Sequence, residues 1–155
     1  MFSVNGEHPA ATARIRGRMA DGTISGRVDF YGVYGGTVVV AMVRGLSGEP
    51  GKGFHGFHIH EGGGCTGNAK DPFADTGQHD NPGNEPHPKH AGDLPPLLGN
   101  NGTAWMAVYT DRFYPEDVIG KTVVIHAKPD DFNTQPSGDS EEKIACGEIV
   151  EWQRR

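Results

Sequence analysis

The sequence has few cysteines, no long apolar run and no excess of positive charge, and each shortage excludes a class of protein. No apolar run approaches the ~20 residues that a membrane-spanning helix needs, so we expect no membrane partner. The 14 basic residues are outnumbered by 20 acidic ones, and the net charge of −6 argues against nucleic acid as a partner. No basic region followed by an apolar one opens the chain, so no signal peptide is visible.

The two cysteines, Cys65 and Cys146, leave two alternatives open. A disulfide closing so long a loop would contribute roughly 4 kcal/mol in the chain-entropy model. In a reducing compartment, two buried free thiols would be the default. A missing leader favours the cytoplasm, whereas a disulfide favours an oxidising space. We expect the cytoplasm in preference to a secreted or periplasmic protein whose leader was removed.

The residues that are abundant predict an all-β protein. With 24 glycines and 11 prolines in 155 residues, the composition suits many short strands joined by turns and long loops. We expect one domain over 1–155, with a flexible N-terminal arm at 1–9 and one helical turn at 115–118. Alternating or β-branched patterns, which are typical of an antiparallel sandwich or barrel, indicate strands at 10–18, 24–31, 37–44, 55–60, 102–110, 122–127 and 144–152.

Two long polar segments interrupt this pattern, at 62–102 and 129–143. The first has about forty residues, loses all periodicity and contains little that could enter a core. Loops of this length inside a compact domain are usually functional or disordered, and the histidines and acids of this one favour function. Such a loop needs a metal ion or a disulfide to hold it in place.

The stretch around His58 and His60 is half of a metal site if it forms a strand. Side chains two residues apart point to the same face, with Cα atoms about 6.7 Å apart. Phe57 and Ile59 then face the core. His55 lies on the opposite face from the pair, and we expect it to be structural and bonded to the backbone. The alternative is two surface histidines on a half-buried strand.

Further candidate ligands lie downstream, in the first long loop and on the strand at 122–127. Imidazole suits copper and zinc, and a carboxylate with three imidazoles suits zinc in a closed, roughly tetrahedral site. Seven ligands are one more than a mononuclear site would use. The economical division gives copper the strand histidines and zinc the loop ligands. The seven candidates are His58, His60, His79, His87, His90, Asp93 and His126.

Six separate blocks resemble the copper/zinc superoxide dismutase family, in family order and with compatible spacing. The resemblance covers roughly residues 12 to 152, and the long gap between Cys65 and His79 is similar to that of bacterial members. The blocks are Gly56-Phe57-His58-Ile59-His60-Glu61, Cys65, His79-Asp80-Asn81-Pro82, His90-Ala91-Gly92-Asp93-Leu94, Val123-Val124-Ile125-His126 and Ile144-Ala145-Cys146-Gly147.

This resemblance implies an eight-stranded antiparallel Greek-key β-barrel, an immunoglobulin-like sandwich with two long functional loops. It also implies one copper and one zinc per subunit, with His79 bridging them, and a disulfide between Cys65 and Cys146. Asp130 matches an aspartate that accepts hydrogen bonds from one copper ligand and one zinc ligand. The implied copper ligands are His58, His60, His79 and His126, and the implied zinc ligands are His79, His87, His90 and Asp93.

Two further features depart from the family pattern. Only Pro88 and Lys89 separate His87 from His90, which is an unusually short gap for the family. The family's active-site arginine, three residues before the second cysteine, is replaced by Lys143. An ammonium keeps the attraction for an anion but lacks the guanidinium's fork of donors. The alternative for Lys143 is a surface ion pair with Glu141 or Glu142.

The implied reaction is dismutation of superoxide to oxygen and hydrogen peroxide through copper redox cycling. We expect His79 to take up a proton and pass it to the departing peroxide, zinc to hold His79, and Lys143 to attract the anion. A non-catalytic copper/zinc buffer or chaperone-like protein is the second hypothesis. A structural barrel with incidental histidines is the third. The sequence leaves a homodimer open.

Overall fold

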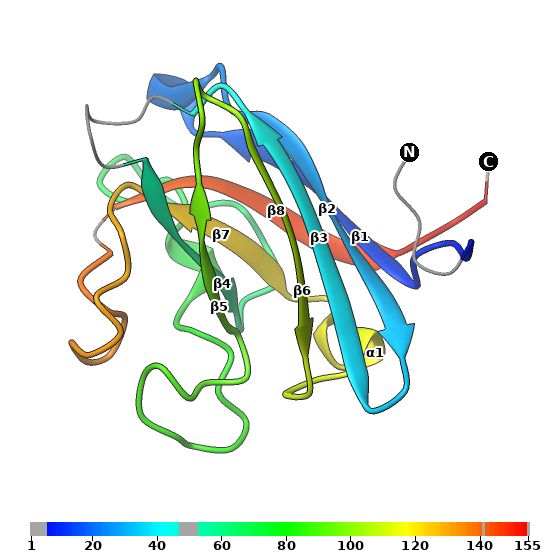
Figure 1. Cartoon of the computed structure of the whole chain (residues 1–155). Helices are drawn as coiled ribbons and strands as arrows, with labels where there is room; N and C mark the ends of the chain where they lie inside the picture. The colour runs from blue at the N-terminus through cyan, green and yellow to red at the C-terminus, as the bar shows by residue number, and fades with distance from the viewer. Residues whose placement is uncertain (1–5, 47–52, 141, 155) are drawn as a thin grey trace.

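The computed structural model describes residues 6–46, 53–140 and 142–154. Eight strands and three short helical turns, two of them 3-10 (η), make up its regular structure (Figure 1). The strands are β1 (Ala11–Gly17), β2 (Ser25–Val33), β3 (Gly36–Arg44), β4 (Phe54–His60), β5 (Asp93–Leu98), β6 (Ala104–Thr110), β7 (Thr122–His126) and β8 (Lys143–Glu151). The turns are η1 (Met19–Asp21), η2 (Ala74–Thr76) and α1 (Pro115–Val118).

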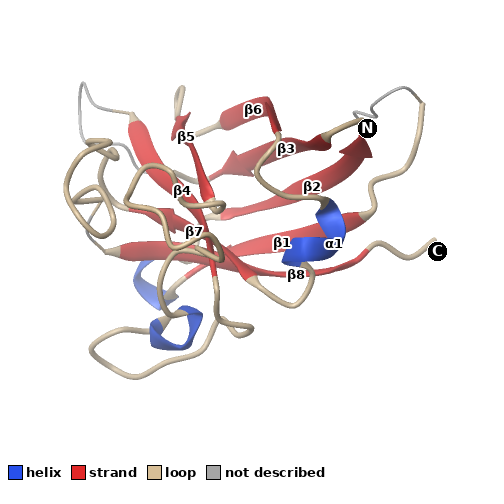
Figure 2. Ribbon diagram, turned by 90° about the horizontal axis from the view of Figure 1, so that it is seen from below, coloured by secondary structure: helices blue, strands red, loops and turns tan. Residues whose placement is uncertain are grey.

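All strand pairings are antiparallel, in the order β5-β4-β7-β8-β1-β2-β3-β6. The two edge strands, β5 and β6, approach each other without a hydrogen-bonded ladder, so the sheet curls into a nearly closed barrel (Figure 2). β1, β2 and β3 follow one another as a meander, whereas the chain crosses over between β3 and β4 and again between β6 and β7. This confirms the expected eight-stranded Greek-key barrel.

The core fills the interior of the barrel with alternate residues of each strand, as the two-residue period requires. Phe57 and Ile59 are fully buried in it, as predicted from the pattern around His58. On β7, Val123 and Ile125 enter the same core, while Val124 packs in a second cluster on the other face. The barrel thereby supplies a rigid backbone from which the outward-pointing histidines of β4 and β7 project.

The sequence patterns missed one strand, and only the family resemblance called for an eighth. β5 lies inside the segment 62–102, which we expected to be a single long loop. Its Pro95 and Pro96 lack the backbone N–H that a ladder uses, so the segment carries no strand signal. Such residues are tolerated at the edge of a sheet, where β5 pairs only with β4.

Two long connections lie beside β4, β5 and β7, one between β4 and β5 and the other between β7 and β8 (Figure 1). The expected helical turn is confirmed as α1. Of the expected N-terminal arm, residues 1–5 lie outside the described residues, and the exposed His8 stacks its ring on Trp152 at a centroid distance of 4.4 Å. None of the helices in the described residues is long and apolar enough to cross a membrane.

Candidate metal centre

Four imidazoles from β4, β7 and the β4–β5 connection converge at one point beside the barrel. We call them the four-histidine cluster: His58, His60, His79 and His126. All four are buried, and one ring nitrogen of each lies within 4.8 Å of the others. His60 Nε2 and His126 Nε2 are 3.3 Å apart. His58 and His60 share a face because they are two residues apart on a strand.

Three imidazoles and a carboxylate converge immediately beside it. We call them the His3Asp cluster: His79, His87, His90 and Asp93. The Nδ1 atoms of His79, His87 and His90 lie 2.8, 3.0 and 3.2 Å from the carboxylate oxygens of Asp93. The short gap between His87 and His90 therefore does not keep them apart, and His87 is buried in the cluster.

His79 belongs to both clusters, and its two ring nitrogens face different ones. Its Nδ1 donates to Asp93 Oδ1 at 2.8 Å and lies 3.3 Å from His90 Nδ1. Its Nε2 is buried without a hydrogen-bond partner and belongs with the four-histidine cluster, where the His58 ring is 4.0 Å away between centroids. A single imidazole therefore stands between two groups of metal-ligand type.

Asp130 connects the two clusters because each of its carboxylate oxygens bonds to a histidine of a different cluster. His58 Nε2 donates to Asp130 Oδ2 at 2.7 Å, and His87 Nε2 donates to Asp130 Oδ1 at 2.8 Å. These bonds fix both rings so that each Nδ1 is left for another partner. Gly138, which has a φ of +74°, lies against this pair; a Cβ there would collide with the Asp130 carboxylate and with His87 Nε2.

Burial and hydrogen bonding favour the metal-binding protonation states of four residues of the clusters. Burial lowers the pKa of His58 to about 4, although the hydrogen bond to Asp130 opposes this shift. Burial also lowers the pKa values of His60 and His90. Burial by itself would raise the pKa of Asp93, but the hydrogen bond from His79 brings it below its usual value. Neutral imidazoles and an ionised carboxylate are the forms that coordinate metal ions.

The residues fit the two ions that they could hold. His58 Nδ1 and His79 Nε2 are buried polar atoms that lack hydrogen-bond partners, a costly state unless something else engages them. Nitrogens about 2.0–2.1 Å from one tetrahedral ion are about 3.3 Å apart. The His60–His126 and His79–His90 separations match this value. Imidazoles alone suit copper, and imidazoles with a carboxylate suit zinc.

The predicted disulfide is confirmed. Cys65 and Cys146 are bonded with a Cα–Cα distance of 5.8 Å and a sequence separation of 81 residues. The bond joins the β4–β5 connection to β8. His55 is confirmed as structural, since its ring contacts the backbone carbonyl of His126 at 3.0 Å through Nδ1.

Lys143 begins β8 and is the Cα partner of His126 on β7. Its side chain is 17% exposed, with Nζ 3.4 Å from the Phe73 carbonyl and 3.5 Å from Asp71 Oδ2. The alternative pairing with Glu142 is not found, because Glu142 forms an ion pair with Arg18 at 3.0 Å. Glu141 lies outside the described residues.

Several residues that support the site escaped the sequence analysis. Gln135 bonds to both backbone groups of His87, at 2.9 Å to its N–H and 2.7 Å to its carbonyl. Arg112 donates from Nη1 to the carbonyls of Pro88 and His90, at 2.7 and 3.0 Å. Because these side chains bind backbone groups far along the chain, no local pattern marks them.

Comparisons with known proteins identify the family. Residues 24–149 match the family model for copper/zinc superoxide dismutase (SODC). The "Superoxide dismutase [Cu-Zn]" of Deinococcus radiodurans is 34% identical over 144 residues, covering 81% of this chain and 77% of the relative. The "Superoxide dismutase [Cu-Zn] 3" of Arabidopsis thaliana is also 34% identical, over 147 residues, covering 83% and 84%.

The fold leads to the same family. The solved structure of the Cu/Zn superoxide dismutase from Brucella abortus superimposes with a TM-score of 0.75 and 25% identity, covering 89% of this chain and 98% of that one. Family model, relatives and fold agree, and both clusters consist of residues that suit the family's two metals, copper and zinc. This chain belongs to the copper/zinc superoxide dismutase family.

Proposed function

We propose that the protein dismutates superoxide, with copper held by the four-histidine cluster and zinc by the His3Asp cluster. The observation that supports this most directly is the position of His79 in both clusters, with a different ring nitrogen facing each. A protein that only stores metal ions gains nothing from sharing one ligand between two sites. Copper bound here would supply one-electron cycling between Cu(II) and Cu(I), which zinc cannot supply.

The chain's own residues position the imidazoles for this reaction. Asp130 fixes the tautomers of His58 and His87, and the Gly77 carbonyl accepts from His60 Nδ1 at 2.9 Å, which leaves His60 Nε2 for the metal. Asp93 holds the Nδ1 side of His79. His79 Nε2 is then the atom that takes up a proton during one half of the cycle and delivers it to the departing peroxide in the other.

Lys143 is the residue that attracts the substrate anion. Its Cα is the register partner of that of His126, a member of the four-histidine cluster. The neighbouring Asp71 carboxylate reduces that charge without removing it, because an ion pair at 3.5 Å near the surface is partly screened. We therefore expect Lys143 to attract superoxide without the bidentate hydrogen bonding that an arginine would provide.

The test is to load the purified full chain with copper and zinc, count the bound ions and measure superoxide removal by pulse radiolysis. We expect one ion of each metal per chain and catalytic turnover. His79→Gln should abolish turnover. Each cluster keeps three of its four candidate ligands in this variant, so each should still bind one metal ion, but more weakly than in the unaltered chain. Full loading of the unaltered chain without turnover would instead support a copper/zinc buffer.

A further inference from the structure

A buried ion pair lies directly beside His79 and belongs to neither cluster. Asp80 follows His79 in the chain, and its Oδ1 lies 2.7 Å from Lys121 Nζ. The side chain of Asp80 is 7% exposed and that of Lys121 is 28% exposed. Among the described residues, the Asp80 carboxylate has no other ion-pair or hydrogen-bond partner. The position of the Asp80 side chain therefore depends on Lys121.

The Lys121 end of the pair projects from a backbone that is held on both sides. The Lys121 N–H donates to the Val118 carbonyl at 3.0 Å, and the Lys121 carbonyl accepts from the Ile149 N–H at 2.9 Å. Val118 and Ile149 are core residues of the barrel. Lys121 also directly precedes β7, whose first residue, Thr122, is the Cα partner of His60. A rigid part of the barrel thus presents the ammonium group.

The Asp80 end lies where the connection between β4 and β5 meets β4. The Asp80 N–H donates to the Ile59 carbonyl at 2.8 Å, and the Asp80 carbonyl accepts from the Gly92 N–H at 3.0 Å. A Cβ at Gly92 would collide with the Ile59 carbonyl, so the three segments meet closely. His79 is the antiparallel bridge partner of His60 at the same place. A shift of Asp80 would move His79 as well, because the two residues share a peptide bond.

Folding alone does not call for a charged pair at this position. Taking a carboxylate and an ammonium out of water is costly, and apolar side chains of similar volume in their place are often neutral or stabilising. Removing only one partner is destabilising, because it leaves a buried charge uncompensated. An ion pair does supply a directional, charge-assisted bond, which apolar packing lacks. Such a bond fixes one arrangement of the two segments that it joins.

We propose that Lys121 is a positioning residue for His79, acting through its ion pair with Asp80. The pair joins the segment that carries His79 to the beginning of β7, so that each ring nitrogen of His79 stays directed to its own cluster. Because His79 belongs to both clusters, loss of the pair weakens both metal sites together. This inference rests on the proposed function only in taking His79 as a ligand of both ions.

The experiment measures the copper and zinc affinities of the full, metal-loaded chain by competition with chromophoric chelators. Lys121→Met should weaken the binding of each metal about tenfold, the lower end of the range for a lost supporting contact. Lys121→Arg keeps a cation beside Asp80 and should stay within about threefold of the unaltered chain. Arg154→Met, which removes an exposed charge near the C-terminus, is the control and should change neither affinity. Unchanged affinities in Lys121→Met, or weaker binding of one metal only, overturn the proposal.

Two further variants separate positioning from folding. Asp80→Leu with Lys121→Met replaces the ion pair by apolar side chains, so the denaturant midpoint of the metal-free chain should stay the same or rise. Both metals should still bind about tenfold more weakly to it; unaltered affinities would mean that the pair only fills space. His79→Gln lacks the shared ring, so adding Lys121→Met to it should cost no further affinity. An equal loss with and without His79 would mean that Lys121 acts through the barrel, and it overturns the proposal.

These affinities do not depend on turnover, so the two proposals can fail separately. A loaded chain that does not remove superoxide would contradict the proposed function, while the expected pattern of affinities would still support the role of Lys121. Unchanged affinities in every variant would contradict the role of Lys121, even in a chain that removes superoxide.

Discussion

Lys143 on β8 is the Cα partner of His126 on β7, so a lysine begins the strand beside a member of the four-histidine cluster. Lys143→Gln should lower the rate of superoxide removal about threefold to tenfold at low ionic strength and make the rate less dependent on salt, because the local attraction is lost. Arg154→Gln, which removes an exposed charge near the C-terminus, is the control. Equal salt dependence in both variants would exclude a steering role for Lys143.

The negative charge of Asp71 opposes the attraction of superoxide by Lys143, so its removal should raise the rate where removal of Lys143 lowers it. Its carboxylate lies 3.5 Å from Lys143 Nζ and is itself well exposed. Asp71→Asn should therefore raise the rate at low ionic strength by a small factor, about twofold, and the gain should vanish in high salt. The measurement is the rate of superoxide removal as a function of sodium chloride concentration. A rate that falls in Asp71→Asn would mean that Asp71 serves mainly to hold Lys143 in place.

Asp130 should affect both metal sites at once, because its two oxygens accept from one ring of each cluster. In Asp130→Asn the amide offers only one acceptor oxygen, so one of the two imidazoles loses its orientation. Loss of such a supporting contact typically costs 10- to 100-fold in metal affinity. Competition with a chromophoric chelator measures this for copper and for zinc separately. Asp131→Asn is the control, since the exposed carboxylate of Asp131 accepts hydrogen bonds only within its own turn.

Arg112 should act on the His3Asp cluster alone. Its Nη1 donates to the carbonyls of Pro88 and His90, on the turn that links His87 to His90. Arg112→Met should weaken zinc binding by about tenfold, which corresponds to the ~1.4 kcal/mol expected for weakened hydrogen bonds at an exposed site, and should leave copper affinity unchanged. Zinc release to a chelator is the measurement. A uniform loss of both metals would show that the variant destabilises the barrel instead.

Seven of the eight strands and the candidate ligands could be predicted from sequence because each of them has a local signal. β3 is rich in β-branched residues, and the two-residue spacing of His58 and His60 itself predicts a shared face. β5 could not be predicted, because Pro95 and Pro96 remove the signal that a strand normally carries. Asp130 was recognised only through the family resemblance, since the sequence alone would make it a solvated loop acid.

The supporting contacts were hidden for a different reason. Gln135 and Arg112 bind backbone groups of a loop 22 to 48 residues away, and their role depends on how the loops approach after folding. Every residue has a backbone carbonyl, so the sequence does not indicate which carbonyl a given side chain will bind. Only the candidate metal ligands have a residue type and spacing that indicate their chemistry.

The disulfide should stabilise the metal-free protein more than any other single bond. Cys65→Ser removes a crosslink that spans 81 residues, for which the chain-entropy model gives about 4.5 kcal/mol. In denaturant unfolding of the metal-free protein, most of this loss of unfolding free energy should appear as a lower denaturant concentration at the midpoint. Cys65 is preferred to Cys146 for the change, because Cys146 is buried and a serine hydroxyl there would add its own penalty. A loss below about 1 kcal/mol would mean that the unfolded chain keeps these segments together without the bond.

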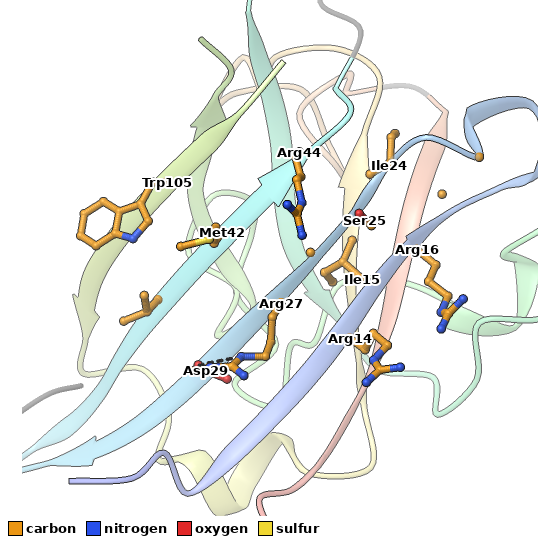
Figure 3. A pocket seen from close by; sticks show the side chains of 14 residues that line it. Arg14, Ile15, Arg16, Ile24, Ser25, Arg27, Asp29, Met42, Arg44 and Trp105 are labelled. Carbon is orange, nitrogen blue, oxygen red and sulfur yellow. Dashed lines mark hydrogen bonds and ion pairs between the residues drawn. The ribbon is translucent and has the colours of Figure 1, made fainter. Parts of the chain in front are cut away.

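The facing pair of Arg14 and Arg27 predicts that a surface charge can be removed with a gain in stability. Arg14 and Arg27 are direct register partners, Arg27 also forms an ion pair with Asp29 (Figure 3), and cross-strand pairs contribute about 0.2–1 kcal/mol each. Arg14→Gln should therefore raise the free energy of unfolding by a few tenths of a kcal/mol at low salt, and the gain should shrink as salt screens the repulsion. Arg154→Gln should change it little. If Arg14→Gln instead destabilises the protein at every salt concentration, the aliphatic part of Arg14 contributes more by covering β1 than its charge costs.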